Sequence, residues 1–276
     1  MRARGLYAVI IAAALAAALG VATLAPGGRE RLLRLTTEDN MTVARHYLHK
    51  LHGGYSLQER VDQFAPAARV RLAAAFARAG LIYPPQAVTF VVFKDTRLLE
   101  IYGRSAADAP WVYVKTVPVL GMSGVLGPKL RAGDEQVPEG IYAAEFLNPN
   151  SRYHVAIRVS YPNALDRARG AAEGRQQLGG DIMIHGTSLS IGLSIGCVAV
   201  GNETAEDLFV LAALVGKEHV RILISPTDFR IHAFESVPTS APWVRDLYVQ
   251  LYTALRRDLS GTGRARPVVS TMVRSM

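Results

Sequence analysis

The spacing of apolar residues changes several times along the chain. Residues 6–25 form an uninterrupted apolar run that follows Arg2 and Arg4. Such a run is long enough to cross a membrane, and basic residues before it stay on the cytoplasmic side. A cleaved signal peptide is the alternative, although cleavage before a proline such as Pro26 is disfavoured. We therefore expect residues 1–26 to be a signal anchor or signal peptide, and the bulk of the chain to be exported.

Residues 27–86 are predicted to form a basic linker followed by a helical extension. Apolar residues four positions apart favour a helix over 39–51. Residues 57–79 predict one or two further helices, broken near Pro66 and ended by Gly80. We expect this extension to pack on the domain that follows.

From residue 87 the pattern changes to β-branched runs and alternating apolar positions, separated by turns. The predicted strands cover 88–93, 97–102, 111–119, 140–146, 153–160, 181–185, 196–200 and 219–225. A helix is expected over 203–215, capped by Asn202 or Thr204, and a short helix or flap over 163–175. The predicted fold class is α+β, with a mostly-β, sandwich- or barrel-like catalytic domain over 87–226 and flanking helices.

The carboxyl-terminal part of the chain returns to helical spacing. Residues 227–259 are expected to form an extension with a helix over 241–259, and the Gly/Arg/Ser-rich residues 260–276 to form a disordered tail. Between the predicted strands, glycines punctuate residues 121–138. No Gly-Lys-Ser/Thr follows them, so we interpret this stretch as a mobile loop beside a substrate site.

The composition narrows the range of partners. A formal net charge of +8 favours anionic partners such as a membrane surface, a cell-wall polymer or nucleic acid. An arginine-rich proteome would give the same charge without any functional meaning. No stretch interleaves basic and aromatic residues as nucleic-acid binders do, so we expect no nucleic-acid partner.

Cys197 is the single cysteine of the chain. In an oxidising compartment it cannot form an internal disulfide, so its thiol is either buried and inert or kept for chemistry. A redox role would need a resolving cysteine, which the chain lacks. His185 ends an apolar run twelve positions earlier, and an imidazole is the usual acceptor for a thiol proton near neutral pH. A glycine beside the thiol lets substrate and backbone N–H groups approach closely.

Three histidines, His46, His49 and His52, stand three positions apart and invite a metal interpretation. No cysteine or carboxylate completes a zinc pattern there, so we expect a solvated helix face and no metal or cofactor.

The segment His185-Gly186, a short spacer and Ser194-Ile195-Gly196-Cys197 resembles the active-site signature of the YkuD-type L,D-transpeptidases. Further segments resemble the YafK-like branch of that family: Val125 to Lys129, Gly133-Asp134, Pro138 to Gly140, Asn148 to Ser151, Pro162 to Ala164 and Asp166-Arg167. The resemblance covers about half of the chain, from near Val88 to near Ser225. Two positions depart from the broader pattern: Ile195 stands where a second histidine is common, and Ala199 where an arginine is common.

The resemblance implies a cysteine acyltransferase that acts on peptidoglycan stem peptides. His185 and Cys197 would be the catalytic pair, and Gly186 or a nearby side chain would orient the imidazole. Gly196 and Ser194 would lie at the oxyanion side. Four basic residues of the family-like segments are candidate partners for substrate carboxylates, namely Lys129, Arg152, Arg158 and Arg167.

The same resemblance leaves the outcome of the reaction open. An amine acceptor would give a cross-link or attach a protein, whereas water would release a wall-linked lipoprotein or trim a stem peptide, as in the YafK-like branch. A peptidoglycan-binding scaffold without turnover is the alternative from another class. In each case the expected location is the periplasm of a Gram-negative bacterium, tethered to the inner membrane or secreted.

Overall fold

The computed structural model describes residues 53–187, 195–233, 237 and 241–259. Contacts divide the chain into two units, residues 1–55 and 56–276, and the second contains all the described helices and strands. The helix that was expected over 39–51 and the predicted tail over 260–276 lie outside the described residues.

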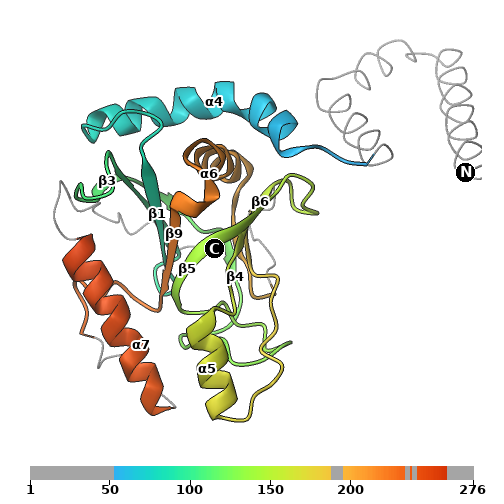
Figure 1. The fold of residues 1–276 in the computed structure, drawn as a ribbon, viewed down its shortest axis with the longest axis vertical. Helices are drawn as coiled ribbons and strands as arrows, with labels where there is room; N and C mark the ends of the chain where they lie inside the picture. The colour runs from blue at the N-terminus through green and yellow to red at the C-terminus, as the bar shows by residue number, and fades with distance from the viewer. Residues whose placement is uncertain (1–52, 188–194, 234–236, 238–240, 260–276) are drawn as a thin grey trace, which may run out of the picture. The chain divides into compact units, whose positions relative to one another are not determined.

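The strands form one continuous curled sheet in the order β3-β2-β1-β9-β5-β6-β7-β8-β4. This mostly-β, curled sheet with flanking helices agrees with the mostly-β, barrel-like part of the prediction (Figure 1). The strands are β1 (Ala87–Phe93), β2 (Leu98–Arg104), β3 (Val112–Pro118), β4 (Gly121–Met122), β5 (Gly140–Asn148), β6 (Ala156–Val159), β7 (Met183–Thr187), β8 (Val198–Gly201) and β9 (Val220–Ser225).

Helices cover both faces of this sheet. They are α4 (Leu57–Arg78), α5 (Ala164–Ala172), α6 (Asn202–Val215) and α7 (Pro242–Thr253), with short turns η1 (Lys217–His219) and η3 (Ala254–Asp258). Helix α6 packs on β1 and on β5 to β8 and is covered by α4, whereas α7 packs on β5 and β9. Figure 1 shows α4 and α6 together on one side of the strands and α7 on the other.

Alternation along the strands divides the core into two clusters. In β1, Val88, Phe90 and Val92 belong to the cluster under α6, while Val91 and Phe93 belong to the cluster under α7. Because side chains alternate between the faces of a strand, a strand covered on both sides becomes a continuous apolar run. The two clusters define the two faces of the sheet: one face lies toward α6, and the other is opposite to it.

Helix α4 runs without interruption through Pro66, so the predicted break there is wrong. A proline inside a helix costs about 3 kcal/mol. The opposing contribution is the burial of Phe64, Ala68, Leu72 and Phe76, which recur every four residues along α4. Burying several such side chains contributes more than the proline costs.

Helix α6 begins differently from the prediction. Its N-cap is Gly201, with no side-chain cap, and Asn202 is already its first residue. The predicted cap at Asn202 or Thr204 is wrong because β8 continues directly into the helix without a loop that could hold a capping side chain.

We expect Phe209→Ala to destabilise the domain by about 3–5 kcal/mol, since Phe209 is fully buried between α6 and the sheet. Leu214→Ala on the same helix is the matched control, because Leu214 is largely exposed. Urea unfolding followed by circular dichroism measures both. Equal midpoints for the two variants would contradict the core described here.

Within the described ranges, no helix has the length and apolar character needed to cross a bilayer. The apolar run over 6–25 lies outside those ranges.

Candidate active site

Strands β7 and β8 place His185 and Cys197 on the same face of the sheet. The two strands are parallel neighbours, with Ile184 opposite Val198 and His185 opposite Ala199. Ile184 and Val198 belong to the cluster under α6, so His185 and Ala199 point to the opposite face. Cys197 immediately precedes β8. If the alternation continues by one residue, its side chain lies on the same face as Ala199, and its Sγ is 3.6 Å from the Asp181 carbonyl oxygen, two residues before β7.

His185 is held by its own strand and covered by a neighbouring turn. Its Nδ1 lies 2.9 Å from the Gly186 carbonyl oxygen, which can only accept, so Nδ1 carries the proton and Nε2 is left as an acceptor. The Tyr153 ring stacks on the imidazole at 4.7 Å between centroids. Burial lowers the pKa of His185, against the opposing effect of the Gly186 carbonyl, so the ring is neutral at pH 7.

The glycine after this histidine is required by packing. A Cβ at Gly186 would stand 2.6 Å from the Asn202 side-chain oxygen and 3.2 Å from the His154 Cβ. Glycine therefore lets β7 pass close to the start of α6, and its carbonyl is the group that orients the imidazole.

The Cys197 thiol is half-buried, and its Sγ–H donates to the Asp181 carbonyl at 3.6 Å. Burial raises the pKa of Cys197; a backbone hydrogen bond at Met183 and the charge of Lys129 act in the opposite direction, and the Asp181 carboxylate adds to the rise. The thiol is therefore protonated at neutral pH, and a nearby base is needed to make it a nucleophile.

The residue before Cys197 has a backbone conformation that favours glycine. Gly196 has φ +88°, and a Cβ there would meet the Gln136 carbonyl oxygen at 3.2 Å. Its N–H donates to Ser123 Oγ at 2.6 Å, and that hydroxyl donates to the Glu135 carbonyl. The predicted oxyanion donor at Gly196 is thus already hydrogen-bonded, and an oxyanion would have to displace Ser123.

The glycine-rich loop beside Cys197 is anchored at both ends. Its first residues form β4, which pairs with β8. At its base the buried Lys94 ammonium lies 3.0 Å from Glu139 and donates to the Gly127 and Val137 carbonyls. Glu139 in turn accepts from the Tyr248 hydroxyl of α7. These contacts fix the loop against β8, close to Cys197.

The structure brings two of the four predicted basic residues together. Arg158 and Arg167 line a hollow of about 380 Å³ that reaches Gly180, next to Asp181. Arg158 stands opposite Met183, on the same face as Cys197. It forms exposed ion pairs with Glu145 at 3.1 Å and Asp181 at 3.3 Å, and pairs of this kind contribute little stability. A substrate carboxylate can therefore compete for its guanidinium.

The other two basic residues lie elsewhere. Lys129 is buried and engaged, with its ammonium 2.5 Å from Asp134 and 2.9 Å from the Arg131 carbonyl. It closes the loop and acts on Cys197 only through its charge. Arg152 is exposed and adjacent to Tyr153, which covers His185. Ser194 lies outside the described residues.

The structure adds three groups to the candidate site that the sequence does not indicate: Tyr153, Ser123 and the Asp181 carbonyl. Tyr153 and Ser123 are far from Cys197 in the sequence, and the third group is a backbone atom, so no local motif indicates them. The described residues contain no group of three His, Cys, Asp or Glu side chains that could hold a metal ion. The histidines at 46, 49 and 52 lie outside that part of the chain.

We expect Ser123→Ala to lower turnover by about three- to thirtyfold, which corresponds to one or two lost hydrogen bonds. The hydroxyl links Gly196 to Glu135, so its removal loosens the peptide before the nucleophile. Ser105→Ala, at an exposed serine in the turn after β2, is the control. Steady-state kinetics with a thermal-melting check measures both, and unchanged turnover in Ser123→Ala would remove this residue from the site.

Residues 90–222 match the family model of the YkuD L,D-transpeptidase catalytic domain. This match confirms the resemblance found in the sequence, and the matched stretch includes the strand that carries His185. The Escherichia coli K12 protein named "Putative L,D-transpeptidase YafK" is 38% identical over 140 residues, which cover 49% of this chain and 52% of that protein. The chain thus spans about half the length of the curated relatives it matches.

Two solved structures are similar in part. The helical cell shape determining protein Pgp2 from Campylobacter jejuni is 25% identical, with a TM-score of 0.41, over 51% of this chain and 48% of that one. Bd1075 from Bdellovibrio bacteriovorus is 21% identical, with a TM-score of 0.37, over 62% of this chain and 55% of that one.

Proposed function

We propose that the chain is a peptidoglycan L,D-transpeptidase-family cysteine acyltransferase that acts on stem peptides through a thioester on Cys197, with His185 as the base. The observation that carries the proposal is the register of β7 and β8, which puts both side chains on one face within the stretch that matches the catalytic domain. A neutral imidazole whose Nε2 can accept a proton and a protonated thiol are the states that general-base activation needs.

In the first half-reaction, Nε2 of His185 takes the Cys197 proton as Sγ attacks the carbonyl of the third residue of the stem peptide. An S–C bond forms, and the tetrahedral intermediate places negative charge on the former carbonyl oxygen. Collapse breaks the C–N bond to the terminal D-alanine. The proton held by His185 passes to the leaving amine.

In the second half-reaction, an acceptor attacks the thioester. His185 takes a proton from the attacking amine or water, a new C–N or C–O bond forms, and Sγ leaves and recovers the proton. Both outcomes use the same pair of residues. Hydrolysis is the second candidate: at the register of His185 the neighbouring strand carries Ala199, fully buried, where the broader pattern has an arginine.

Substrate carboxylates have a place to bind in this proposal. Arg158 and Arg167 converge on the hollow that ends at Gly180, and the backbone continues from there to the Asp181 carbonyl beside Sγ. Arginine guanidinium groups pair with carboxylates through two parallel hydrogen bonds. A stem peptide with its carboxylate in the hollow would present its chain toward Cys197.

The proposed setting is the periplasm, with residues 1–26 as an anchor or signal segment and the cell wall as the partner. A wall-linked lipoprotein is a partner only if water resolves the thioester.

Incubation of the protein with disaccharide-tetrapeptide and with lipoprotein-linked muropeptide, followed by mass spectrometry, tests the proposal. A cross-linked dimer with loss of D-alanine supports transfer, whereas a freed or shortened stem peptide supports hydrolysis. If neither substrate changes and no acyl group appears on the Cys197 peptide, the catalytic proposal is wrong and a binding scaffold remains.

A further inference from the structure

A second cavity lies apart from Cys197. It has a volume of about 600 Å³, in the range of small-molecule sites. Its lining comes from the ends of β1, β2, β5 and β9, from η1 and η3, and from the turn that holds Trp111. In the sheet order, β9 and β7 are separated by β5 and β6, and neither His185 nor Cys197 is among the residues that line this cavity.

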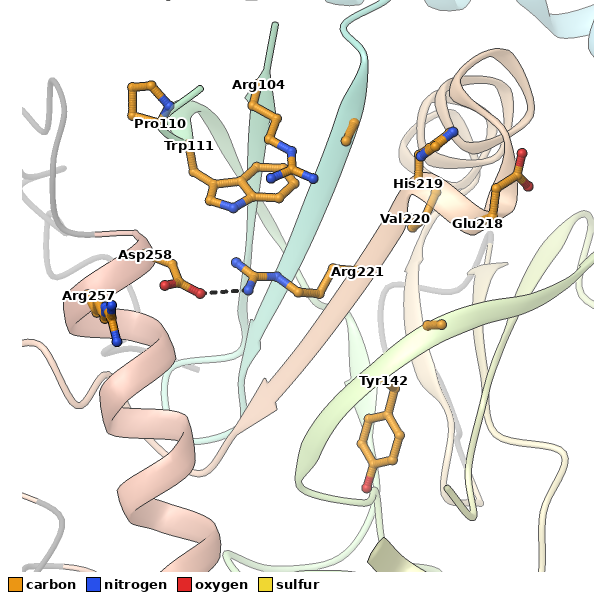
Figure 2. A pocket seen from close by; sticks show the side chains of 12 residues that line it. Arg104, Pro110, Trp111, Tyr142, Glu218, His219, Val220, Arg221, Arg257 and Asp258 are labelled. Atoms are coloured by element: carbon orange, nitrogen blue, oxygen red, sulfur yellow. Dashed lines mark hydrogen bonds and ion pairs between the residues drawn. The ribbon is translucent and has the colours of Figure 1, made fainter. Parts of the chain in front are cut away.

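Two arginines meet on the ring of Trp111 inside this cavity. The guanidinium carbons of Arg104 and Arg221 lie 4.6 Å and 5.1 Å from the ring centroid. Figure 2 shows both side chains extending toward Trp111, and Asp258 reaching Arg221 from the far wall. Nη1 of Arg221 lies 2.7 Å from Oδ2 of Asp258 in an ion pair. Nη1 of Arg104 donates to the Ala107 carbonyl.

Each of the two guanidinium groups has one buried nitrogen without a hydrogen-bond partner in the described part of the chain. Nε of Arg104 and Nη2 of Arg221 are buried and have no hydrogen-bond partner among the described residues. A buried donor without an acceptor is unfavourable, and two of them in one cavity point to an acceptor that comes from outside.

The charges and the apolar surface of the cavity lining indicate which kind of acceptor fits it. The lining holds three arginines and two acids, Arg104, Arg221 and Arg257 against Glu218 and Asp258, an excess of one positive charge. One excess charge suits a singly charged carboxylate better than a phosphate, which carries nearly two charges at pH 7. Ala87, Pro110, Ala143 and Val220 supply apolar surface for the body of an organic acid.

We propose that this cavity binds an organic carboxylate of about dipeptide size, held by Arg104 and Arg221 against Trp111. The site is separate from the catalytic pair, and the inference stands whether or not Cys197 forms a thioester.

Isothermal titration calorimetry of the full chain with N-acetyl-alanyl-alanine, its C-terminal amide and inorganic phosphate tests the proposal. We expect the free acid to bind, and the amide and phosphate to bind at least about tenfold more weakly. Arg104→Gln should lower the affinity for the free acid by about tenfold or more. The affinity of Arg104→Lys should lie between those of the parent chain and Arg104→Gln, because lysine keeps the charge but not the planar guanidinium group.

Two controls separate this site from the rest of the protein. Arg78→Gln removes the same charge at an exposed position at the end of α4 and should leave binding unchanged. Cys197→Ala should also leave it unchanged, which separates this site from the thiol chemistry. Four results would each overturn the proposal: the intact chain does not bind the acid, it binds the amide as tightly as the acid, it binds phosphate as tightly as the acid, or Arg104→Gln leaves the affinity for the acid unchanged. If Arg104→Gln does not fold, the affinity of Arg104→Lys for the free acid is the test, and an affinity equal to that of the parent chain overturns the proposal.

Discussion

Cys197→Ala is expected to lower turnover of stem peptides by at least about a thousandfold, because no other side chain on that face of β8 can form the thioester. Cys197 is the only cysteine of the chain, so a substitute thiol is not available. Cys197→Ser should be almost as inactive, since a hydroxyl is far harder to deprotonate than a thiol. Both substitutions are small, and the fold should be retained.

Mass spectrometry of muropeptide products measures this effect, with a thermal melt of each variant to verify folding. Ser105→Ala serves again as the variant that should behave as the parent chain. Turnover by Cys197→Ala at the parent rate would rule out the thioester mechanism.

His185→Gln is expected to slow alkylation of Cys197 by iodoacetamide about a hundredfold at pH 7. Burial raises the pKa of the Cys197 thiol, so without a base the thiolate is scarce until the pH exceeds the ordinary value of 9.0. Burial lowers the pKa of His185 below 6.5, so in the parent protein the neutral base is present at pH 7 and persists as the pH falls past 6.5. The parent alkylation rate should therefore decline only below pH 6.5, and the variant's rate should rise only at high pH.

Mass spectrometry of the Cys197 peptide over time gives these rates. The matched control is His232→Gln, at an exposed histidine in the turn after β9. Slow labelling in the parent chain that does not change in His185→Gln would favour the binding scaffold over the enzyme.

Much of the strand pattern was predictable because it depends on local alternation. The predicted strand over 181–185 corresponds to β7, and that over 219–225 to β9, each within two residues. The predicted strand over 153–160 is reduced to β6, because residues 153–155 turn to carry Tyr153 onto His185. That contact depends on a residue 32 positions away, which a local pattern cannot contain.

The sequence by itself determined the candidate residues for the proposed chemistry: one thiol, an imidazole twelve positions before it, and glycines after the histidine and before the cysteine. These follow from residue type and near-neighbour spacing, which folding does not change. The tertiary structure alone decided that β7 and β8 are parallel neighbours, that Ser123 occupies the Gly196 amide, and that Arg158 and Arg167 share a hollow. It also decided that Arg104 and Arg221 meet on Trp111. The physical reason is that strand order and register are set by burying apolar faces against α6 and α7, an interaction between segments that are distant in the sequence.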